Sequence, residues 1–463
     1  MPELPIKKYD EPVLRNKARP VKKINRALLS LLDDMWETMR AAEGVGLAAT
    51  QVGVLQRVVV IDVGEDPIEL INPVIVGRAG EEEGIEACLS VPGLMGEVER
   101  SERVTVKALD RRGKTFWLDA EGLLARVVQH ELDHLDGVVF VDRASSLTKI
   151  EPPPRFRVVF MGTSDFSVPS LRALARHHEV VAVITRPDRP VGRRKIMTPP
   201  PVKEVAEQLG LCVLQPQDCR SPEFRDELAG LEPEILVVVS FGQILPKGVL
   251  EVTPWGAVNV HASLLPKYRG AAPIQHAIMN GEERTGVTLM KMVGRLDAGD
   301  IILQAAVPIG ANDTYGTLEK KLAHVGAKVL LRGLERMVKE DFAPLPQAEE
   351  RATFAPSLDR SDERVQWQEP AVQIERKIRA LYPEPGAYVS WQGRRLKLWQ
   401  TRVVESPTAL PPGQVVDVTD EGPVVMCGQD ALILERVQVS GGKPMDGASF
   451  SRGYRIQPGD SLI

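Results

Sequence analysis

The chain has 463 residues. A single hydrophobic core stops growing at about 250 to 300 residues, so we expect two or three domains. Hydrophobic residues make up 43% of the sequence and charged residues 26%, and the net charge is only -5. This composition excludes a largely disordered chain and gives no global sign of nucleic-acid binding, although a local basic patch is compatible with it.

The N-terminal sequence MPELPIKKYDEPVLR lacks the uninterrupted apolar stretch of a signal peptide, and no apolar run reaches the ~18 residues needed to cross a bilayer. We therefore expect a cytoplasmic protein without a membrane partner. The cysteines, Cys88, Cys212, Cys219 and Cys427, are too few and too widely spaced for a disulfide framework. Each is expected to be a core thiol, a metal ligand or a catalytic residue.

The segment EGLLARVVQHELDHLDG, residues 121–137, has the apolar periodicity of a helix and ends in a glycine suited to close it. Its two histidines, His130 and His134, stand one turn apart and therefore share a face. Leu123 and Val127 fall on the same face. We expect this face to point into the protein.

Two imidazoles four residues apart on a helix, with Glu131 between them, form the arrangement H-E-x-x-H, in which both histidines bind a metal and the carboxylate lies beside the water to be activated. Two alternatives stay open: a helix with two partly buried histidines, and a zinc peptidase whose third ligand lies downstream. Cys88, in EEGIEACLSVPG, is a better third ligand, because a thiolate and two imidazoles leave one coordination position open for water.

A domain boundary is expected at residues 149–155, where three consecutive prolines form a stiff polyproline spacer. Directly after it come an apolar strand, RFRVVFMG (155–162), a helical pattern over residues 168–174 and a second strand, VVAVIT (180–185). This order predicts a parallel sheet, so an α/β domain is expected to follow a first domain of residues 1–148.

The α/β pattern continues through ILVVVSFG (235–242) and GAVNVHAS (256–263), and the second domain is expected to span residues 156–340. Residues 341–366 are rich in proline and charge and are interpreted as a second linker. Residues 367–463 contain short alternating segments separated by Gly and Pro, which predict a small β-barrel.

The first turn of the α/β domain, MGTSDF, has one glycine and does not support dinucleotide binding. More informative is the strand expected at residues 257–263, because Asn259, His261 and Ser263 project to one side of it. They stand near its carboxyl end, where open α/β sheets place their active sites. In isolation, a hydrogen-bonded polar pair at a sheet edge is the simpler interpretation.

Three motifs in order, GVGLAATQVG (44–53), EACLS (86–90) and QHELDHLDG (129–137), resemble the signature motifs of the peptide deformylase family. The resemblance covers about residues 1–148. It implies an α+β fold, a divalent metal (Fe2+ or Zn2+), and hydrolysis of the formyl group of N-formylmethionyl nascent peptides at the ribosome. The residues that it implies are the metal ligands Cys88, His130 and His134, the proton shuttle Glu131, and two oxyanion donors, the side chain of Gln51 and the backbone N–H of Leu89.

Ala87 departs from the glycine that the family usually has before the cysteine. If the backbone had a positive φ at this position, the added Cβ would cost about 1 to 2 kcal/mol. The departure keeps open the alternative that the first domain is a catalytically silent binding module and that only the second domain is an enzyme.

The sequence NVHASLLP (259–266), with YRG (268–270) and GRLDAGDI (294–301), resembles the folate-dependent formyltransferase family, with a Rossmann-like domain and 10-formyltetrahydrofolate as formyl donor. The residues that it implies are the triad Asn259, His261 and Asp297 and the folate contacts Ser263, Leu264, Leu265 and Pro266. When an amine attacks a formyl carbon, His261 can move the proton, Asp297 can orient the imidazole, and Asn259 can donate to the oxyanion.

Members of that family formylate glycinamide ribonucleotide, an amino sugar or initiator methionyl-tRNA. Two features favour the tRNA. Residues 186–203 resemble a basic loop that engages the acceptor stem, with Arg193, Arg194 and Lys195 suited to phosphates, although a solvated surface loop is the alternative. Residues 367–463 resemble the OB-like barrel of the tRNA enzymes through LYPEPGAY and FSRGYRIQPGD.

Two further departures are Ser164, where the family has proline, and MVGRLDAG, which lacks an acidic residue after the methionine. Neither departure involves a residue of the triad. Their expected effect is on the affinity for folate. We therefore predict a multi-domain, bifunctional enzyme that deformylates nascent peptides and formylates initiator methionyl-tRNA, without a DNA partner.

Overall fold

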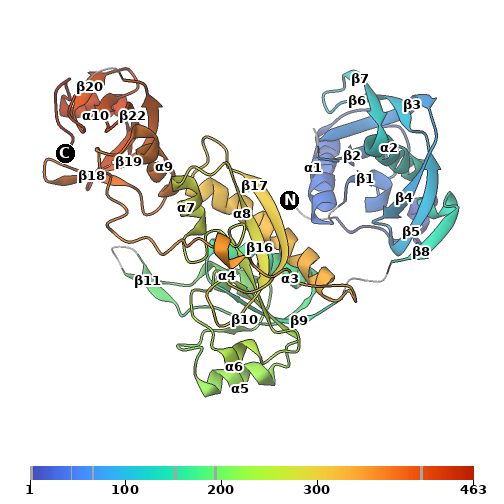
Figure 1. Ribbon diagram of the computed structural model, residues 1–463. Coiled ribbons are helices and arrows are strands. Elements are labelled where there is room, and N and C mark those ends of the chain that lie inside the picture. Colours follow the sequence, from blue (N-terminus) through green and yellow to red (C-terminus); the bar gives the residue numbers. More distant parts are fainter. Residues whose placement is uncertain (1–3, 43, 65–66, 151–153, 192–194, 407–409) are drawn as a thin grey trace. The chain divides into compact units, whose positions relative to one another are not determined.

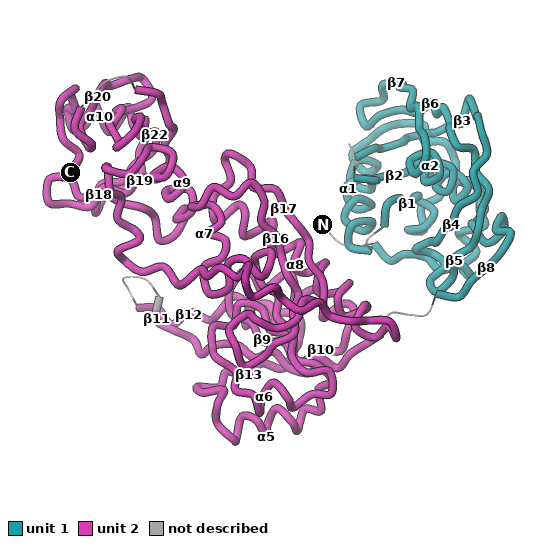
Figure 2. Tube along the Cα trace, viewed as in Figure 1, with its two compact units in different colours: residues 1–152 teal, residues 153–463 magenta. Residues whose placement is uncertain are grey.

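The computed structural model describes the chain except residues 1–3, 43, 65–66, 151–153, 192–194 and 407–409. The chain divides into two compact units, residues 1–152 and 153–463 (Figures 1 and 2). The prolines at 152 and 153, expected to form the spacer, lie outside the described residues. Among the described helices, none combines the length and the apolar character needed to cross a membrane.

The described residues of the first unit form antiparallel strands and the α-helices α1 and α2. One sheet has the order β1-β2-β3-β6-β7, and a second has the order β4-β5-β8. The elements are η1 (Pro12–Arg15), α1 (Arg26–Ala41), β1 (Gly46–Ala48), η2 (Ala49–Val52), β2 (Val58–Ile61), β3 (Ile68–Ala79), β4 (Glu82–Cys88), β5 (Val91–Arg100), β6 (Arg103–Leu109), β7 (Thr115–Glu121), α2 (Gly122–Leu135), η3 (Phe140–Asp142) and β8 (Ser146–Lys149).

Strand β2 separates α1 from α2. All of its residues are buried. Since alternate side chains of a strand point to opposite faces of the sheet, both faces must be covered here. Val59 and Ile61 belong to the core that includes α2, whereas Val58 and Val60 belong to the core that includes α1. The sheet is therefore covered on both sides at this strand, and α2 is held against one side.

Helix α2 buries nearly all of its last three turns, including His130 and His134. Val127 is buried, as expected, but Leu123 is 58% exposed, so the prediction that it points inward was wrong. Leu123 stands in the first turn, directly after β7, where the helix has not yet reached the core. The helix ends as predicted, with Gly137 in the left-handed conformation at φ 78°.

The second unit begins with a mixed sheet in the order β13-β10-β9-β14-β15-β16-β17. Strands β9, β10, β13, β14 and β15 are parallel, and β16 and β17 are antiparallel additions. The elements are β9 (Arg157–Gly162), η4 (Asp165–Ser167), α3 (Val168–His177), β10 (Glu179–Ile184), β11 (Arg189–Val191), β12 (Ile196–Thr198), α4 (Pro201–Gln208), β13 (Val213–Leu214), α5 (Pro222–Gly230), β14 (Ile235–Val239), α6 (Lys247–Leu250), β15 (Ala257–His261), α7 (Pro273–Met279), β16 (Arg284–Lys291), β17 (Ile301–Pro308) and α8 (Tyr315–Met337).

The long helix α8 lies close to the sheet because it carries glycine where it crosses the strands. A Cβ at Gly333 would stand 2.2 Å from Leu289 Cδ2, and one at Gly326 would stand 3.1 Å from Val260 Cγ1. The close approach seals one face of the sheet. The opposite face is covered by a separate core that includes Phe224 and Leu228 of α5.

The C-terminal part of the second unit has its own core around an antiparallel sheet, in the order β18-β19-β22-β21-β20, with β23 paired to β22. Its elements are α9 (Ala371–Ala380), β18 (Tyr388–Trp391), β19 (Arg394–Val404), β20 (Val415–Val418), β21 (Pro423–Met426), β22 (Ala431–Val439), β23 (Met445–Asp446) and α10 (Gly447–Tyr454).

The segment expected to be a linker, residues 341–366, contains the short helix η5 (Glu349–Arg351) and is tied to the preceding domain by main-chain hydrogen bonds. Leu345 pairs with Ile301 of β17, and Ala355 pairs with Arg269 in the loop after β15. The segment therefore follows a fixed path over the loops of the α/β sheet.

Candidate functional site

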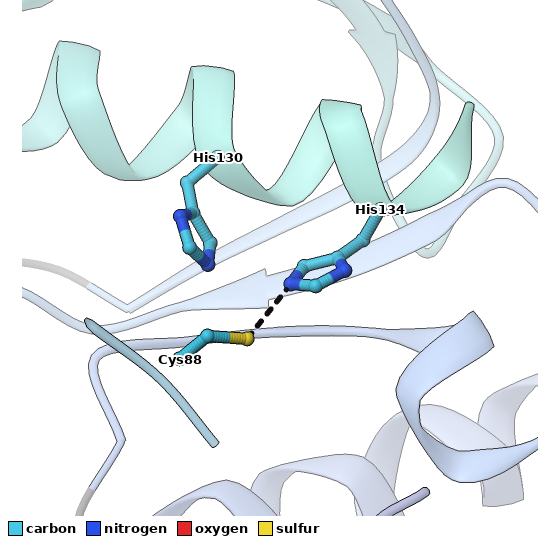
Figure 3. Close-up of side chains that lie close together, drawn as sticks. All are labelled: Cys88, His130 and His134. Carbon is cyan, nitrogen blue, oxygen red and sulfur yellow. Dashed lines mark hydrogen bonds between the residues drawn. The ribbon is translucent and has the colours of Figure 1, made fainter. Parts of the chain in front are cut away.

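Cys88, His130 and His134 come together in the first unit. One sulfur and two ring nitrogens, one ligand atom from each residue, lie within 4.8 Å of one another. Cys88 Sγ is 3.1 Å from His134 Nε2, and Figure 3 shows the thiol facing both imidazoles of the helix. The three residues predicted as ligands thus form one cluster, although the histidines lie far beyond the cysteine in the sequence.

Two elements supply the residues of this cluster. The two histidines stand on consecutive turns of α2, and Cys88 ends β4, just before the turn of Leu89 and Ser90 that leads into β5. Glu131 of α2 approaches β1 so closely that a Cβ at Gly46 would meet its Oε1 at 2.4 Å. This contact accounts for the glycine of the first motif, because any side chain there would displace the carboxylate.

A buried ionic network fixes the orientation of His130. Its Nδ1 donates to Glu86 Oε2 at 2.8 Å, which leaves Nε2 to face the cysteine. Glu86 also accepts two hydrogen bonds from Arg100, whose guanidinium contacts Asp133. Burial alone would raise the pKa of Glu86, but the hydrogen bonds from Arg100 and His130 lower it to about 2. Glu86 therefore stays ionised.

The sulfur of Cys88 has two donors besides the histidines. The backbone N–H of Ser90 lies 3.4 Å from Sγ, and the side-chain Nε2 of Gln51 lies 3.6 Å from it. Gln51 is itself held, since its Oε1 accepts from the backbone N–H of Ala48 at 2.8 Å. These contacts hold the Cys88 sulfur in place opposite the two histidines.

Burial shapes the titration of the remaining groups. It raises the pKa of Glu131 to about 7, and Oε2 of this carboxylate has no hydrogen-bond partner among the described residues. It also lowers the pKa of His134, which keeps that imidazole neutral. Burial opposes a charge on His130, but hydrogen bonds with Cys88 and Glu86 outweigh it and raise its pKa to about 10. At this raised pKa His130 carries a proton on Nε2, and a metal ion that binds through Nε2 must displace that proton.

The donor set fits a divalent transition metal. One thiolate and two imidazoles are ligands that such ions prefer, and three protein ligands leave a coordination position for water or substrate. The first unit therefore holds a Cys-His-His site beside a carboxylate able to exchange a proton near neutral pH.

Ala87 does not strain this site. It lies within β4, its side chain is exposed, and it is not among the residues with positive φ. The cost expected for a left-handed backbone therefore does not arise at this position.

In the second unit, His261 ends β15 and lies beside Asp297. Asp297 Oδ2 is 3.7 Å from His261 Nδ1, and both side chains are largely buried. Asn259, two residues earlier on the same strand, lines the same cavity of about 830 Å3. The three residues predicted as a triad thus border one cavity near the carboxyl end of β15.

Main-chain groups hold this arrangement. His261 Nε2 lies 2.9 Å from the carbonyl oxygen of Tyr268, and Asp297 Oδ2 accepts from the N–H of Gly270 at 2.8 Å. Because a carbonyl can only accept, Nε2 carries the proton and Nδ1 is the basic nitrogen in the neutral imidazole. The Tyr268 carbonyl therefore contacts one nitrogen of His261 and Asp297 lies beside the other, so the prediction that Asp297 orients the imidazole and stabilises its cation stays a prediction.

The structure places the predicted folate contacts, residues 263–266, in the loop after β15. Residues 263–266 are not part of the cavity lining. Ser263 is fully buried and donates to the Lys267 carbonyl at 2.6 Å, and Leu265 N–H donates to Thr288 Oγ1 at 3.1 Å. Ser263, Leu264, Leu265 and Pro266 thus form a hydrogen-bonded turn that supports the loop after β15.

The basic loop is described only in part. Arg193 and Arg194 lie outside the described residues. Lys195 is exposed, with a left-handed backbone at φ 48°, beside the hairpin of β11 and β12. Ser164 lines the cavity and donates to Ser240 Oγ at 2.8 Å, so this departure from the family pattern does lie at the site.

Several residues of the two sites were missed from the sequence. Glu86 belongs to a motif that was recognised, and its neighbour Cys88 could have pointed to it. Tyr268 acts through its carbonyl, which carries no sequence signal. Gln347, which donates to the carbonyls of Asp297 and Gly299, stands in the segment interpreted as a linker.

Fold and site define a metal hydrolase unit followed by a one-carbon transferase unit. The family models that match are "Polypeptide deformylase" over residues 3–150, "Formyl transferase" over residues 156–334, and "Formyl transferase, C-terminal domain" over residues 357–455.

Relatives of both parts are known. Methionyl-tRNA formyltransferase of Bacillus velezensis is 46% identical over 308 residues, which is 66% of this chain and 97% of the relative. That of Moorella thermoacetica is 48% identical over 307 residues, 66% of this chain and 99% of the relative. The crystal structure of peptide deformylase from Thermotoga maritima shares 44% identity over 32% of this chain and 100% of its own, with a TM-score of 0.31.

The chain therefore belongs to the peptide deformylase family in its first unit and to the methionyl-tRNA formyltransferase family in its second.

Proposed function

We propose that this chain carries out two opposite formyl reactions. The first unit hydrolyses the N-formyl group of formylmethionyl peptides, and the second transfers a formyl group from 10-formyltetrahydrofolate to the amino group of initiator methionyl-tRNA. Membership of both families supports the two activities. The single observation that carries the proposal is that each unit gathers a complete set of reactive side chains around one buried point or cavity.

In the first unit, Cys88, His130 and His134 would hold Fe2+ or Zn2+. When bound, such a cation makes water available as hydroxide near neutral pH. Glu131 takes the proton from the attacking water and delivers it to the leaving amine, a role that suits a buried carboxyl whose pKa is raised to about 7. Gln51 and the Leu89 N–H donate to the oxyanion.

In the second unit, His261 removes the proton of the attacking amine. Its Nδ1 is free to do so because Nε2 donates to the Tyr268 carbonyl, and the carboxylate of Asp297 stabilises the imidazolium that results. Asn259 donates to the oxyanion that forms on the formyl carbon. Ser263, Leu264, Leu265 and Pro266 remain the proposed folate contacts, in the hydrogen-bonded turn that follows β15.

The tRNA is proposed as acceptor because the C-terminal domain of the formyl transferases matches residues 357–455 and the curated relatives bear the name methionyl-tRNA formyltransferase. Arg193, Arg194 and Lys195 would contact acceptor-stem phosphates. We further propose a Rossmann-like fold for residues 156–340, an OB-like fold for residues 367–463, and a cytoplasmic location.

The test uses the intact chain. Formate release from a formyl-Met peptide and formyl transfer to initiator methionyl-tRNA are measured on metal-loaded, anaerobically purified protein, before and after chelation. We expect chelation to abolish formate release and to leave transfer intact. Absence of formate release with either metal would refute the first activity, and transfer to glycinamide ribonucleotide in place of the tRNA would refute the second.

The alternative of a silent first unit depended on Ala87. That residue has no positive φ and therefore introduces no backbone strain beside Cys88. The three metal ligands lie together, and the carboxyl group of Glu131 has a pKa near neutral pH, so we propose that the first unit is an active hydrolase.

A further inference from the structure

The segment of residues 345–356, here called the strap, crosses both loops of the transferase site. Its first residue, Leu345, exchanges two main-chain hydrogen bonds of 2.8 Å with Ile301. Near its other end, Arg269 donates to Thr353 O at 2.8 Å, and Ala355 donates to Arg269 O at 2.7 Å. The strap is therefore fixed at the first residue of β17 and at the loop after β15.

Between these anchors, one side chain joins the two loops. Gln347 Nε2 donates to the carbonyl oxygens of Asp297 and Gly299, at 2.8 and 2.7 Å. Gln347 Oε1 accepts from Nη2 and Nε of Arg269, at 2.8 and 3.1 Å. Arg269 is 3% exposed, and its guanidinium also donates to Glu349.

The two loops joined in this way hold the reacting side chains. The loop after β15 supplies the Tyr268 carbonyl to His261 and the Gly270 N–H to Asp297. The loop before β17 supplies Asp297 itself, whose backbone is left-handed at φ 46°. This conformation is uncommon for a residue with a Cβ and persists where neighbouring contacts impose it.

We propose that Gln347 is a positioning residue of the transferase reaction. It acts through Asp297 and Arg269 and touches neither substrate. Its amide group holds Asp297 in the left-handed conformation and sets the spacing between the two loops, and hence the distance between Asp297 and His261. This inference rests on the proposed transferase function and adds a residue that lies 50 positions beyond Asp297 in the sequence.

Two variants of Gln347 distinguish the role of its amide N–H donors from the role of its amide oxygen. Gln347→Glu keeps the size and strengthens the contact with the Arg269 guanidinium, but it removes both N–H donors and turns a carboxylate toward two carbonyl oxygens. Gln347→Ala removes both contacts. Glu350→Gln is the control, because Glu350 stands exposed on the same strap.

Transfer to initiator methionyl-tRNA is measured in the intact chain, with formate release from a formyl-Met peptide as internal control. We expect kcat for transfer to fall about 10- to 100-fold in Gln347→Glu, the range expected when catalytic groups are displaced by about an ångström. KM for both substrates should stay within about threefold, since no substrate contact is removed. Formate release and the Glu350→Gln variant should be unchanged.

The proposal is overturned if Gln347→Glu transfers formyl groups at the wild-type rate, or if kcat and both KM values deteriorate together with the thermal midpoint of the second unit. If Gln347→Ala does not fold, Gln347→Glu decides alone, because it retains the partner of Arg269. A wild-type chain without transferase activity would instead refute the proposed function itself, so the two failures are distinguishable.

Discussion

The two sites of this chain are held in different ways. In the first unit, side chains hold side chains: Glu86 orients His130, Arg100 orients Glu86, and the glycine at position 46 makes room for Glu131. In the second unit, main-chain groups hold His261 and Asp297. A site of the first kind is specified by a few residue identities, whereas one of the second kind is specified by the path of its loops.

The strongest test of this contrast is removal of a metal ligand. We expect Cys88→Ser to reduce bound metal and formate release by more than about 100-fold, since loss of even an outer-shell partner costs 10- to 100-fold. Metal content per chain and formate release measure this effect. Formyl transfer in the same protein should be unchanged, and a joint loss of both activities would break the comparison.

Glu86→Gln probes the orienting network without replacing a metal ligand. The amide keeps the shape but loses the charge that pairs with Arg100, so we expect metal affinity to fall about 10- to 100-fold. Titration with a competing chelator measures the change. Wild-type affinity would show that the position of His130 does not depend on Glu86.

Gly270→Ala tests the main-chain site. Gly270 has φ 119°, and a Cβ there would stand 2.6 Å from the carbonyl oxygen of Ala355. We expect the second unit to lose about 1 to 3 kcal/mol of unfolding free energy, together with roughly tenfold lower kcat for transfer. Denaturant unfolding and initial rates decide this. Alanine tolerated at full activity would mean that the loop path is not what fixes Asp297.

The last effect concerns pH. Burial lowers the pKa of His178 to about 4, and its Nδ1 accepts from the N–H of Phe156 at 3.3 Å. Because the folded pKa lies below the unfolded value of about 6.5, the unfolded chain binds more protons between these values. The free energy of unfolding should therefore fall as the pH drops from about 6.5 to about 4, by an amount of the order of 3 kcal/mol at most.

In His178→Gln, the free energy of unfolding of the second unit should depend less on pH. The pH dependence of the first unit's unfolding should be unchanged. The comparison is made by denaturant unfolding of both proteins at several pH values. Identical slopes in wild type and variant would show that His178 does not carry the effect.

The sequence predicted the side-chain site more completely than the main-chain one. The helix with His130 and His134 and the cysteine at position 88 follow from ligand chemistry and spacing, and the structure places them together. Leu123 was misplaced because periodicity alone does not say where a helix meets its core. The hydrogen bonds of residues 263–266, which support the loop after β15, carry no sequence signal, and contact of these residues with the folate stays a prediction.

The linker prediction shows a different difficulty. Proline and charge in residues 341–366 are typical of a connection between domains, and these residues do connect two parts of the second unit. Their main-chain groups nevertheless pair with Ile301 and Arg269. Main-chain pairing of an irregular segment leaves no residue pattern, so it could not be predicted.

The strap also limits how the chain can change in length. Its pairing at Leu345 and at Ala355 fixes the number of residues between these two points, because an insertion would shift Gln347 away from the carbonyls that it binds. Added residues are tolerated only outside this interval. The connection between two domains is thereby divided into a stretch of fixed length that belongs to an active site and flanks that are free to vary.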